Sequence, residues 1–462
     1  MDRARHHAAR WLDGLDTRSV AATTTLEQLR ARLGVPLTDC GVDPVRVIDD
    51  LVAATEGGLN GSPSGRFFAW VIGGTLPAAL GADWLTSAWD QNAGLYATAP
   101  AAAIAEEVAG AWLLDLLELP RDASFALVTG CQMAHVTALA AARHALLRDA
   151  GWNVEQDGLF GAPPIRVLAT EQRHHTLDRA MRFLGLGERA LQIIPSDHRG
   201  CATREALEDA LLASTGPTLV VLAAADLNTG EFDSFRSLIP MAKAADAWVH
   251  VDGAFGLFAR ASATKRHLLD GVELADSWAT DAHKWLNAPY DSGIAIVRDR
   301  EAHRNAMTLH ASYLPPSDSG RDEVDWNPEL SRRARGFALY AALRELGRGG
   351  VADIVDRCCA HCHAIVTAIG ALPGAEMVAE PLLNQGLVRF LDPRASATDV
   401  DHDARTDAVI AAINATGEAF FGGVTWKGRR AMRVSVVNWR TNESDVARTI
   451  EAVRRVLAER AP

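Results

Sequence analysis

The sequence predicts an α/β protein in which helices cover both faces of a mostly parallel, seven-stranded sheet. Short apolar, β-branched runs alternate with helical segments through the middle of the chain, which is the pattern of parallel strands joined by crossover helices. Polar residues follow several of these runs, and such sheets bind ligands at the carboxyl ends of their strands. We expect a helical arm over residues 1–60, a large domain over 61–345 and a small C-terminal α/β domain over 346–462.

The composition indicates a soluble globular protein and excludes several classes of partner. The 462 residues are 48% hydrophobic and 23% charged, and the net charge of -12 argues against a nucleic-acid or anionic-membrane partner. No apolar run reaches the ~18 residues of a membrane span, and the polar N-terminus lacks the apolar core of a secretory signal. Six cysteines in so long a chain do not suggest a disulfide framework. We therefore expect a cytoplasmic protein with reduced thiols.

The individual elements are predicted from spacing and from helix-breaking residues. Residues 44–55 have apolar side chains at helical spacing and are soon followed by two glycines, so they predict a helix of the arm. Residues 101–119, rich in alanine and leucine, predict a long helix that ends at Pro120. The expected strands of the large sheet are 125–128, 165–169, 191–194, 218–223, 247–251, 277–280 and 293–297. Two strands of the small domain are expected at 387–391 and 432–436.

Lys284 and Asp252 are the pair on which the expected chemistry depends. Asp252 ends a strongly strand-like run, and Lys284 follows another such run directly after His283. A lysine can form a Schiff base with an aldehyde, and a carboxylate can hold a pyridine nitrogen in its protonated form. An enzyme that uses pyridoxal 5'-phosphate (PLP) needs both groups, because the ring accepts electrons well only while its nitrogen stays protonated. A solvated lysine and a turn aspartate are the structural alternative.

A phosphate site is predicted near the start of the large domain. The strand-like run at 125–128 leads through Thr129, Gly130, Cys131 and Gln132 into an alanine- and leucine-rich helical segment. Free backbone N–H groups and the helix dipole at such a turn favour an anion. Many α/β turns look similar, so this turn is a weak signal on its own.

Together these segments resemble the group II PLP-dependent decarboxylases, which include the aromatic amino-acid and glutamate decarboxylases. The resemblance rests on His-Val-Asp-Gly-Ala at 250–254 and His-Lys-Trp at 283–285, and it extends over about residues 61–441. It implies a fold-type-I PLP enzyme and a lyase of amino-acid metabolism that releases CO2 from an amino-acid substrate. It also implies a homodimer with active sites at the subunit interface, where the arm packs on the partner subunit.

The resemblance assigns roles to individual residues. Lys284 would carry the cofactor, Asp252 would pair with the ring nitrogen, and Ala254 would lie against one face of the ring. His174, in a segment similar to the family's Gln-x-His-x-Ser/Thr, would stack on the other face and contact the substrate carboxylate. His283 would contact the phosphate.

Three further candidates have ordinary structural alternatives. Asn228 lies in a loop similar to one that contacts the cofactor in the family, but it also suits a plain turn. Trp89 and Tyr96 are candidate substrate contacts that would hint at an apolar or aromatic substrate, although aromatic residues here are more often core.

The phosphate turn departs from the family pattern. Cys131, Gln132, Met133 and His135 replace the usual Gly/Ala, Ser/Thr, Glu and Asn/Thr. Backbone donors tolerate such changes, but the lost hydroxyl leaves Thr129 or His283 to supply side-chain contacts.

A second departure bears on the reaction. Family decarboxylases carry a loop tyrosine that protonates the carbon from which CO2 has left, but residues 315–325 contain no tyrosine. Alignment places Glu323 or a neighbour there, and Tyr313 lies just before the loop. The missing tyrosine leaves open another PLP-dependent lyase or an oxidative, aldehyde-forming decarboxylase. The altered phosphate turn leaves open a non-catalytic homologue that binds PLP, or nothing, and acts through an interface.

A cluster of cysteine and histidine at 358–363 could suggest a metal site. One apolar helical stripe contains Val351, Val355, Cys358, Cys362, Ile365 and Ile369. We therefore expect Cys358 and Cys362 to behave as small core residues and expect no metal.

Overall fold

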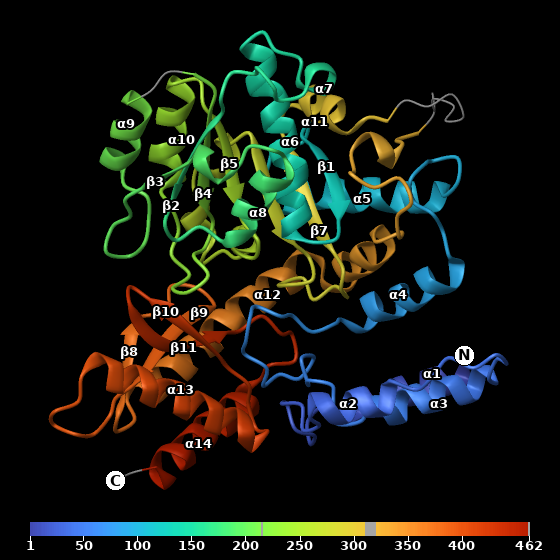
Figure 1. The fold of residues 1–462 in the computed structure, drawn as a ribbon, viewed down its shortest axis with the longest axis vertical. Helices are drawn as coiled ribbons and strands as arrows, with labels where there is room; N and C mark the ends of the chain where they lie inside the picture. The colour runs from blue at the N-terminus through green and yellow to red at the C-terminus, as the bar shows by residue number, and fades with distance from the viewer. Residues whose placement is uncertain (214–215, 310–319, 461–462) are drawn as a thin grey trace. The chain divides into compact units, whose positions relative to one another are not determined.

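The computed structural model describes residues 1–213, 216–309 and 320–460, which form two compact units (Figure 1). One unit combines residues 1–74 with 360–462, and the other comprises residues 75–359. Helix α12, Gly336–Gly370, continues from the second unit into the first. Within the described ranges, no helix has both the length and the apolar character needed to cross a membrane.

The unit of residues 75–359 is built on a seven-stranded sheet of order β1-β7-β6-β5-β4-β2-β3. The strands are β1 Ser124–Val128, β2 Arg166–Thr170, β3 Leu191–Ile194, β4 Thr218–Ala223, β5 Trp248–Asp252, β6 Ser277–Asp281 and β7 Gly293–Val297. Only β7 runs antiparallel to its neighbours, so the predicted mostly parallel sheet is confirmed. Each predicted strand agrees with the observed bounds to within one residue.

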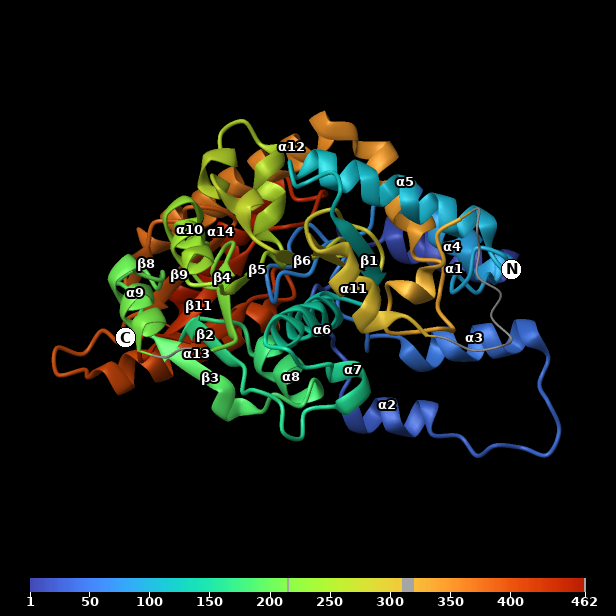
Figure 2. The same ribbon diagram turned by 90° about the horizontal axis from the view of Figure 1, so that it is seen from above.

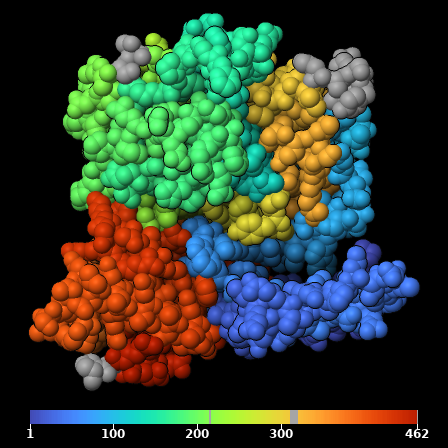
Figure 3. Space-filling model, viewed as in Figure 1, coloured from blue at the N-terminus to red at the C-terminus, as the bar shows by residue number. Residues whose placement is uncertain are grey.

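Helices cover both faces of this sheet. Helices α6, Cys131–Asp149, and α8, His175–Phe183, lie on one face, whereas α5, Pro100–Leu116, and α10, Phe235–Ala244, lie on the other (Figure 2). The other helices of the unit are α4 Pro77–Trp89, α7 Val154–Asp157, α9 Arg204–Leu212 and α11 Arg300–Met307. Side chains of the helices and their connections hide the strands in the space-filling view (Figure 3).

Small residues allow the helices to approach the sheet closely. Ala134, Ala138 and Ala141 of α6 are fully buried. Gly110 of α5 faces the Phe125 ring, and a Cβ on this glycine would lie 2.1 Å from a ring carbon. The close approach of α5 to β1 therefore requires glycine.

The other unit contains a four-stranded antiparallel sheet of order β10-β11-β9-β8. Its elements are α1 Asp2–Asp13, α2 Leu26–Leu33, α3 Pro44–Thr55, β8 Ala375–Ala379, β9 Gln385–Phe390, α13 Asp399–Thr416, β10 Gly422–Trp426, β11 Arg429–Ser435 and α14 Glu443–Glu459. Helix α3 has the predicted bounds, and none of α1, α2 and α3 contains a buried residue. Cys358 and Cys362 of α12 are buried, as the apolar stripe predicts.

Arg66 fastens the segment after the arm to the C-terminal part of the same unit. Its side chain is 1% exposed and donates to the Asp16 carbonyl at 3.0 Å. It also forms ion pairs with Glu418 and Asp445 at 3.4 and 3.6 Å. A buried guanidinium with several acceptors orders this segment.

Candidate active site

The candidate site lies where β5, β6 and the start of α6 meet. Gly293, the first residue of β7, is paired with Val128 on one side and with Asp281 on the other. This register brings the turn after β1 next to the loop after β6. A Cβ on Gly293 would lie 2.4 Å from the Gly130 Cα, so the two backbones are in direct contact.

Lys284 is paired with a carboxylate that the sequence interpretation missed. Its Nζ lies 3.0 Å from Asp281 Oδ2, and Asp281 Oδ1 accepts the Cys131 backbone N–H at 2.6 Å. Asp281 therefore reaches the helix N-terminus at which a phosphate site was predicted. Burial lowers the pKa of Lys284, but the Asp281 carboxylate outweighs it and the pKa lies above its usual value.

His283 presents an N–H donor beside the same helix terminus. Its Nδ1 accepts the Ser292 backbone N–H at 3.1 Å, so the hydrogen of the neutral ring is on Nε2. Nε2 lies 3.5 Å from Asp281 Oδ1, and the ring stacks on Tyr290 at 4.3 Å between centroids. Burial lowers the pKa of His283 although Asp281 opposes this. The neutral ring can therefore donate to an anion.

Asp252 is held as a carboxylate at the end of β5. Its Oδ1 accepts the Ala254 backbone N–H at 3.2 Å, and its Oδ2 lies 3.5 Å from His135 Nε2. Burial by itself raises the pKa of Asp252, but His135, and after it His174 and Lys284, lower it below its usual range. The anionic form is the one that can hold a protonated ring nitrogen.

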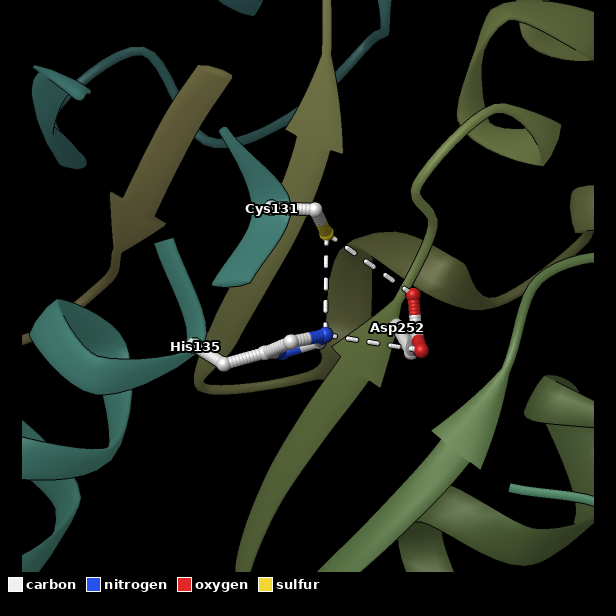
Figure 4. Close-up of side chains that lie close together, drawn as sticks. All are labelled: Cys131, His135 and Asp252. Carbon is white, nitrogen blue, oxygen red and sulfur yellow. Dashed lines mark hydrogen bonds and ion pairs between the residues drawn. The ribbon is translucent and has the colours of Figure 1, made fainter. Parts of the chain in front are cut away.

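Cys131, His135 and Asp252 form a cluster in this site (Figure 4). Cys131 Sγ lies 3.6 Å from His135 Nε2 and 3.9 Å from Asp252 Oδ1. Their three ligand-type atoms lie within 4.8 Å of one another, and zinc binds such groups only when the sulfur is a thiolate. Burial raises the pKa of the Cys131 thiol well above its usual value, so in the absence of a metal ion the sulfur is a neutral thiol in hydrogen-bond contact with His135 and Asp252.

His174 caps the N-terminus of α8 beside this cluster. Its Nδ1 accepts the Thr176 backbone N–H at 3.3 Å, which leaves the hydrogen of the neutral ring on Nε2. Partial desolvation lowers the pKa of His174, Asp252 opposes this, and Lys284 adds to it. Gln132 Nε2 donates to the Thr176 carbonyl at 3.1 Å and ties the starts of α6 and α8 together.

Asn228 Oδ1 and Gln132 Oε1 are among the buried acceptors that have no hydrogen-bond partner in the described ranges. The Asn228 backbone N–H donates to Asp226 Oδ1 at 2.9 Å, so this residue does form a turn. Its side-chain oxygen remains unsatisfied, and a buried polar atom in that state indicates a missing ligand or water.

Trp89 and Tyr96 are not brought into this cluster. Trp89 is 50% exposed at the end of α4 and packs edge-on against Phe337 at 5.1 Å. The Tyr96 backbone N–H donates to Asp322 Oδ1 at 2.8 Å. Across the described part of the chain, no hydrogen bond or ring contact joins either residue to the Lys284 site.

Tyr313 and Glu323 are the candidates for the role of the missing loop tyrosine. Tyr313 lies outside the described ranges. Glu323 is 1% exposed and lies 3.1 Å from Arg321 Nε, and it accepts from Asn327 Nδ2 at 3.2 Å. The structure therefore shows Glu323 as a buried ion-pair partner.

These features fit PLP as a group. The Lys284 amine is linked through Asp281 to a helix N-terminus that also has the neutral His283 donor beside it. On the neighbouring strand the anionic Asp252 accepts the backbone N–H of the small Ala254. Fold and site together define a PLP-dependent enzyme. Residues 41–391 match the model of the pyridoxal-dependent decarboxylase conserved domain, and the chain belongs to this family.

Individual relatives agree with this assignment. The chain is 23% identical over 456 residues to an aromatic-L-amino-acid decarboxylase of Bacillus atrophaeus, covering 97% of this chain and 92% of that protein. It is 29% identical over 388 residues to an L-2,4-diaminobutyrate decarboxylase of Rhizobium meliloti, covering 81% and 74%. The crystal structure of Oryza sativa TDC with PLP and tryptamine has the same fold, with a TM-score of 0.91, 23% identity and coverage of 99% and 98%. The protein is a PLP-dependent amino-acid decarboxylase, as the sequence predicted.

Proposed function

We propose that Lys284 carries the cofactor and that the α-carboxylate of an amino acid leaves as CO2 at this site. The observation that supports this is the position of Lys284 and Asp252 on neighbouring parallel strands: Asp252 ends β5 and Lys284 follows β6. Each charge also shifts the pKa of the other toward its ionised form. When bound, PLP supplies the electron sink for the electron pair left on the α carbon.

The surrounding residues hold the cofactor and substrate. Asp252 keeps the ring nitrogen protonated, Ala254 leaves space for one face of the ring, and His174 covers the other. The His174 Nε2–H is available to bind the substrate carboxylate, because Nδ1 is occupied by Thr176.

The phosphate is held at the N-terminus of α6. The turn at Thr129 and Gly130 and the first residues of the helix, Cys131 and Gln132, would bind it through their backbone. The Cys131 N–H, which donates to Asp281 Oδ1 in this structure, would exchange that partner for the phosphate. His283 adds its Nε2–H, and Asn228 offers a further polar contact to the cofactor.

The test compares Lys284→Ala with the control Lys427→Ala, which removes a lysine near Trp426. Lys284→Ala should abolish the visible absorbance band of the bound cofactor, whereas Lys427→Ala should keep it. A panel of amino acids should give one amine and one equivalent of CO2 by mass spectrometry. Aldehyde with ammonia as the main product would contradict simple decarboxylation.

An apolar or aromatic substrate and a homodimer complete the proposal. Trp89 and Tyr96 would contact the substrate in the assembled dimer. The arm supports dimerisation because its helices expose large apolar side chains, including Leu26 at 69% and Leu51 at 53%. Sedimentation should show a dimer at micromolar concentration, and a monomer would contradict it.

A cytoplasmic location is supported by the six cysteines, which are all free. Cell fractionation should recover the enzyme with the cytosolic proteins. Recovery in a secreted or membrane fraction would refute this location.

A further inference from the structure

A line of buried side chains leads away from the Asp252 carboxylate into the sheet. His135 Nδ1 lies 2.9 Å from His250 Nε2, and His250 Nδ1 lies 2.9 Å from Ser277 Oγ. At the far end, Trp248 Nε1 donates to Ser277 Oγ at 2.9 Å. His135, His250 and Ser277 are 0% exposed. The line therefore connects the cofactor site with the interior without reaching solvent.

The hydrogen bonds of this line have a direction. Trp248 Nε1 can only donate, and among the described residues His250 is the other partner of the Ser277 hydroxyl. The hydroxyl hydrogen therefore points at His250 Nδ1, which places the His250 hydrogen on Nε2, facing His135 Nδ1. The His135 hydrogen is then on Nε2, 3.5 Å from Asp252 Oδ2. Every donor in the line points toward the carboxylate.

We propose that His135 is a positioning residue that, with His250 and Ser277 behind it, orients Asp252 and keeps the proton of the pair on the cofactor's ring nitrogen. A carboxylate that accepts a hydrogen bond is less basic than one that does not, so it competes less for the shared proton. The aligned donors behind His135 polarise its Nε2–H further. Burial holds the pKa of His250 at about 3, so this ring stays a neutral member of the line.

His135 reaches both Asp252 and His250, which a shorter side chain at this position cannot do at once. The proposal rests on PLP as the cofactor and not on the identity of the amino-acid substrate.

The test reads the protonation of the ring nitrogen directly. Apoprotein is loaded with PLP labelled with 15N in the ring, and the 15N chemical shift is recorded from pH 6 to 9 without substrate. In the wild type the shift should remain that of a protonated nitrogen. In His135→Asn, the shorter side chain loses the donor to Asp252, so the shift should move toward the neutral value. The dissociation constant for PLP should rise about tenfold, as expected for one hydrogen bond to a charged group.

Two further variants separate positioning from packing. His135→Gln places an amide N–H near the former Nε2, so it should restore the wild-type 15N shift. Ser277→Ala keeps His135 but removes the hydroxyl that orders the line, so it should move the shift in the same direction by a smaller amount.

The matched control is His303→Asn in the same unit. His303 is also 0% exposed and bonds to Ser124 Oγ at 2.8 Å, but it has no contact with Asp252. Its 15N shift should equal that of the wild type. The proposal is overturned if a folded His135→Asn keeps the wild-type shift and PLP affinity, or if His303→Asn alters them equally. One zinc per chain, bound by the wild type and lost in His135→Asn, would also overturn it.

Discussion

Asp281 lies 3.0 Å from Lys284 and holds the Lys284 amine in an ion pair. Since the carboxylate raises the pKa of Lys284, Asp281→Asn should lower it and increase the neutral, nucleophilic fraction of the amine. We expect the apoprotein to capture PLP about tenfold faster at pH 7 for each unit by which the pKa falls. Stopped-flow absorbance measures this rate.

The control for this prediction is Asp291→Asn. Asp291 is in the same loop but pairs with Arg335 at 2.6 Å. Its substitution should leave the rate of PLP capture at pH 7 unchanged. An Asp281→Asn rate no faster than that of this control would show that the ion pair does not limit loading.

Glu323 should make stability depend on pH in a specific direction. Burial, opposed by Arg321 and assisted by Glu106, raises its pKa from 4.5 to about 7. A raised pKa of an acid means that the folded state binds the proton more tightly, so stability is lost as pH rises through about 4.5 to 7. Glu323→Gln should remove on the order of 2 kcal/mol of this loss. Urea unfolding at pH 5 and pH 8 measures it, and an unchanged difference between the two pH values would contradict the assignment.

Glu106 and Arg332 form an ion pair at 2.8 Å with both side chains 0% exposed. Glu106→Ala should cost about 3–5 kcal/mol of unfolding free energy, because it leaves a buried guanidinium without its counter-charge. The control is Asp83→Ala, which breaks the exposed pair with Arg333 and should cost less than about 1 kcal/mol. Denaturant unfolding compares the two, and equal losses would argue against this explanation.

Gly293→Ala should damage both stability and cofactor binding. The new methyl group would meet the Gly130 backbone at 2.4 Å, which neither strand nor turn can avoid without moving. We expect a loss of about 1–3 kcal/mol in stability and weaker PLP binding, because the phosphate turn is displaced. Gly349→Ala in α12, where a Cβ meets nothing within 4 Å, should leave PLP binding unchanged and should not lower stability, because Ala is the better helix former. Fluorescence titration with PLP and thermal unfolding distinguish these outcomes.

The sequence predicted the seven strands well because each is a short apolar run between breakers, and six of them are almost fully buried. The exception is the edge strand β3, which is mostly half-buried or exposed. Strands β8 and β10 were missed because they lie at the two edges of their sheet and alternate between exposed and half-buried positions. Their apolar pattern is therefore weak.

For the site, the chemistry of Lys284 and Asp252 suggested the pair, and the family resemblance assigned the roles of Lys284, His283 and Asp252, which stay predictions. Neither identified Asp281, although this residue precedes Lys284 by three. The position of His250 could have been predicted, since it stands two residues before Asp252 and therefore points to the same side of the strand. The contact between His135 and His250 joins residues 115 positions apart and depends on how α6 packs on the sheet. Local sequence patterns do not carry that information.

The strand order determines when parts of the newly made chain can fold. Strand β1 lies at the edge of its sheet, with β7 as its partner. During synthesis, β1 therefore cannot pair until the ribosome has made β7, which begins at Gly293. Chains in synthesis fold as their segments emerge, so the turn at Gly130 has no fixed place until most of its unit has been translated. Capture of the vitamin-derived cofactor is thereby postponed to a late stage of biosynthesis, and truncated chains that end before β7 should leave the ribosome without it.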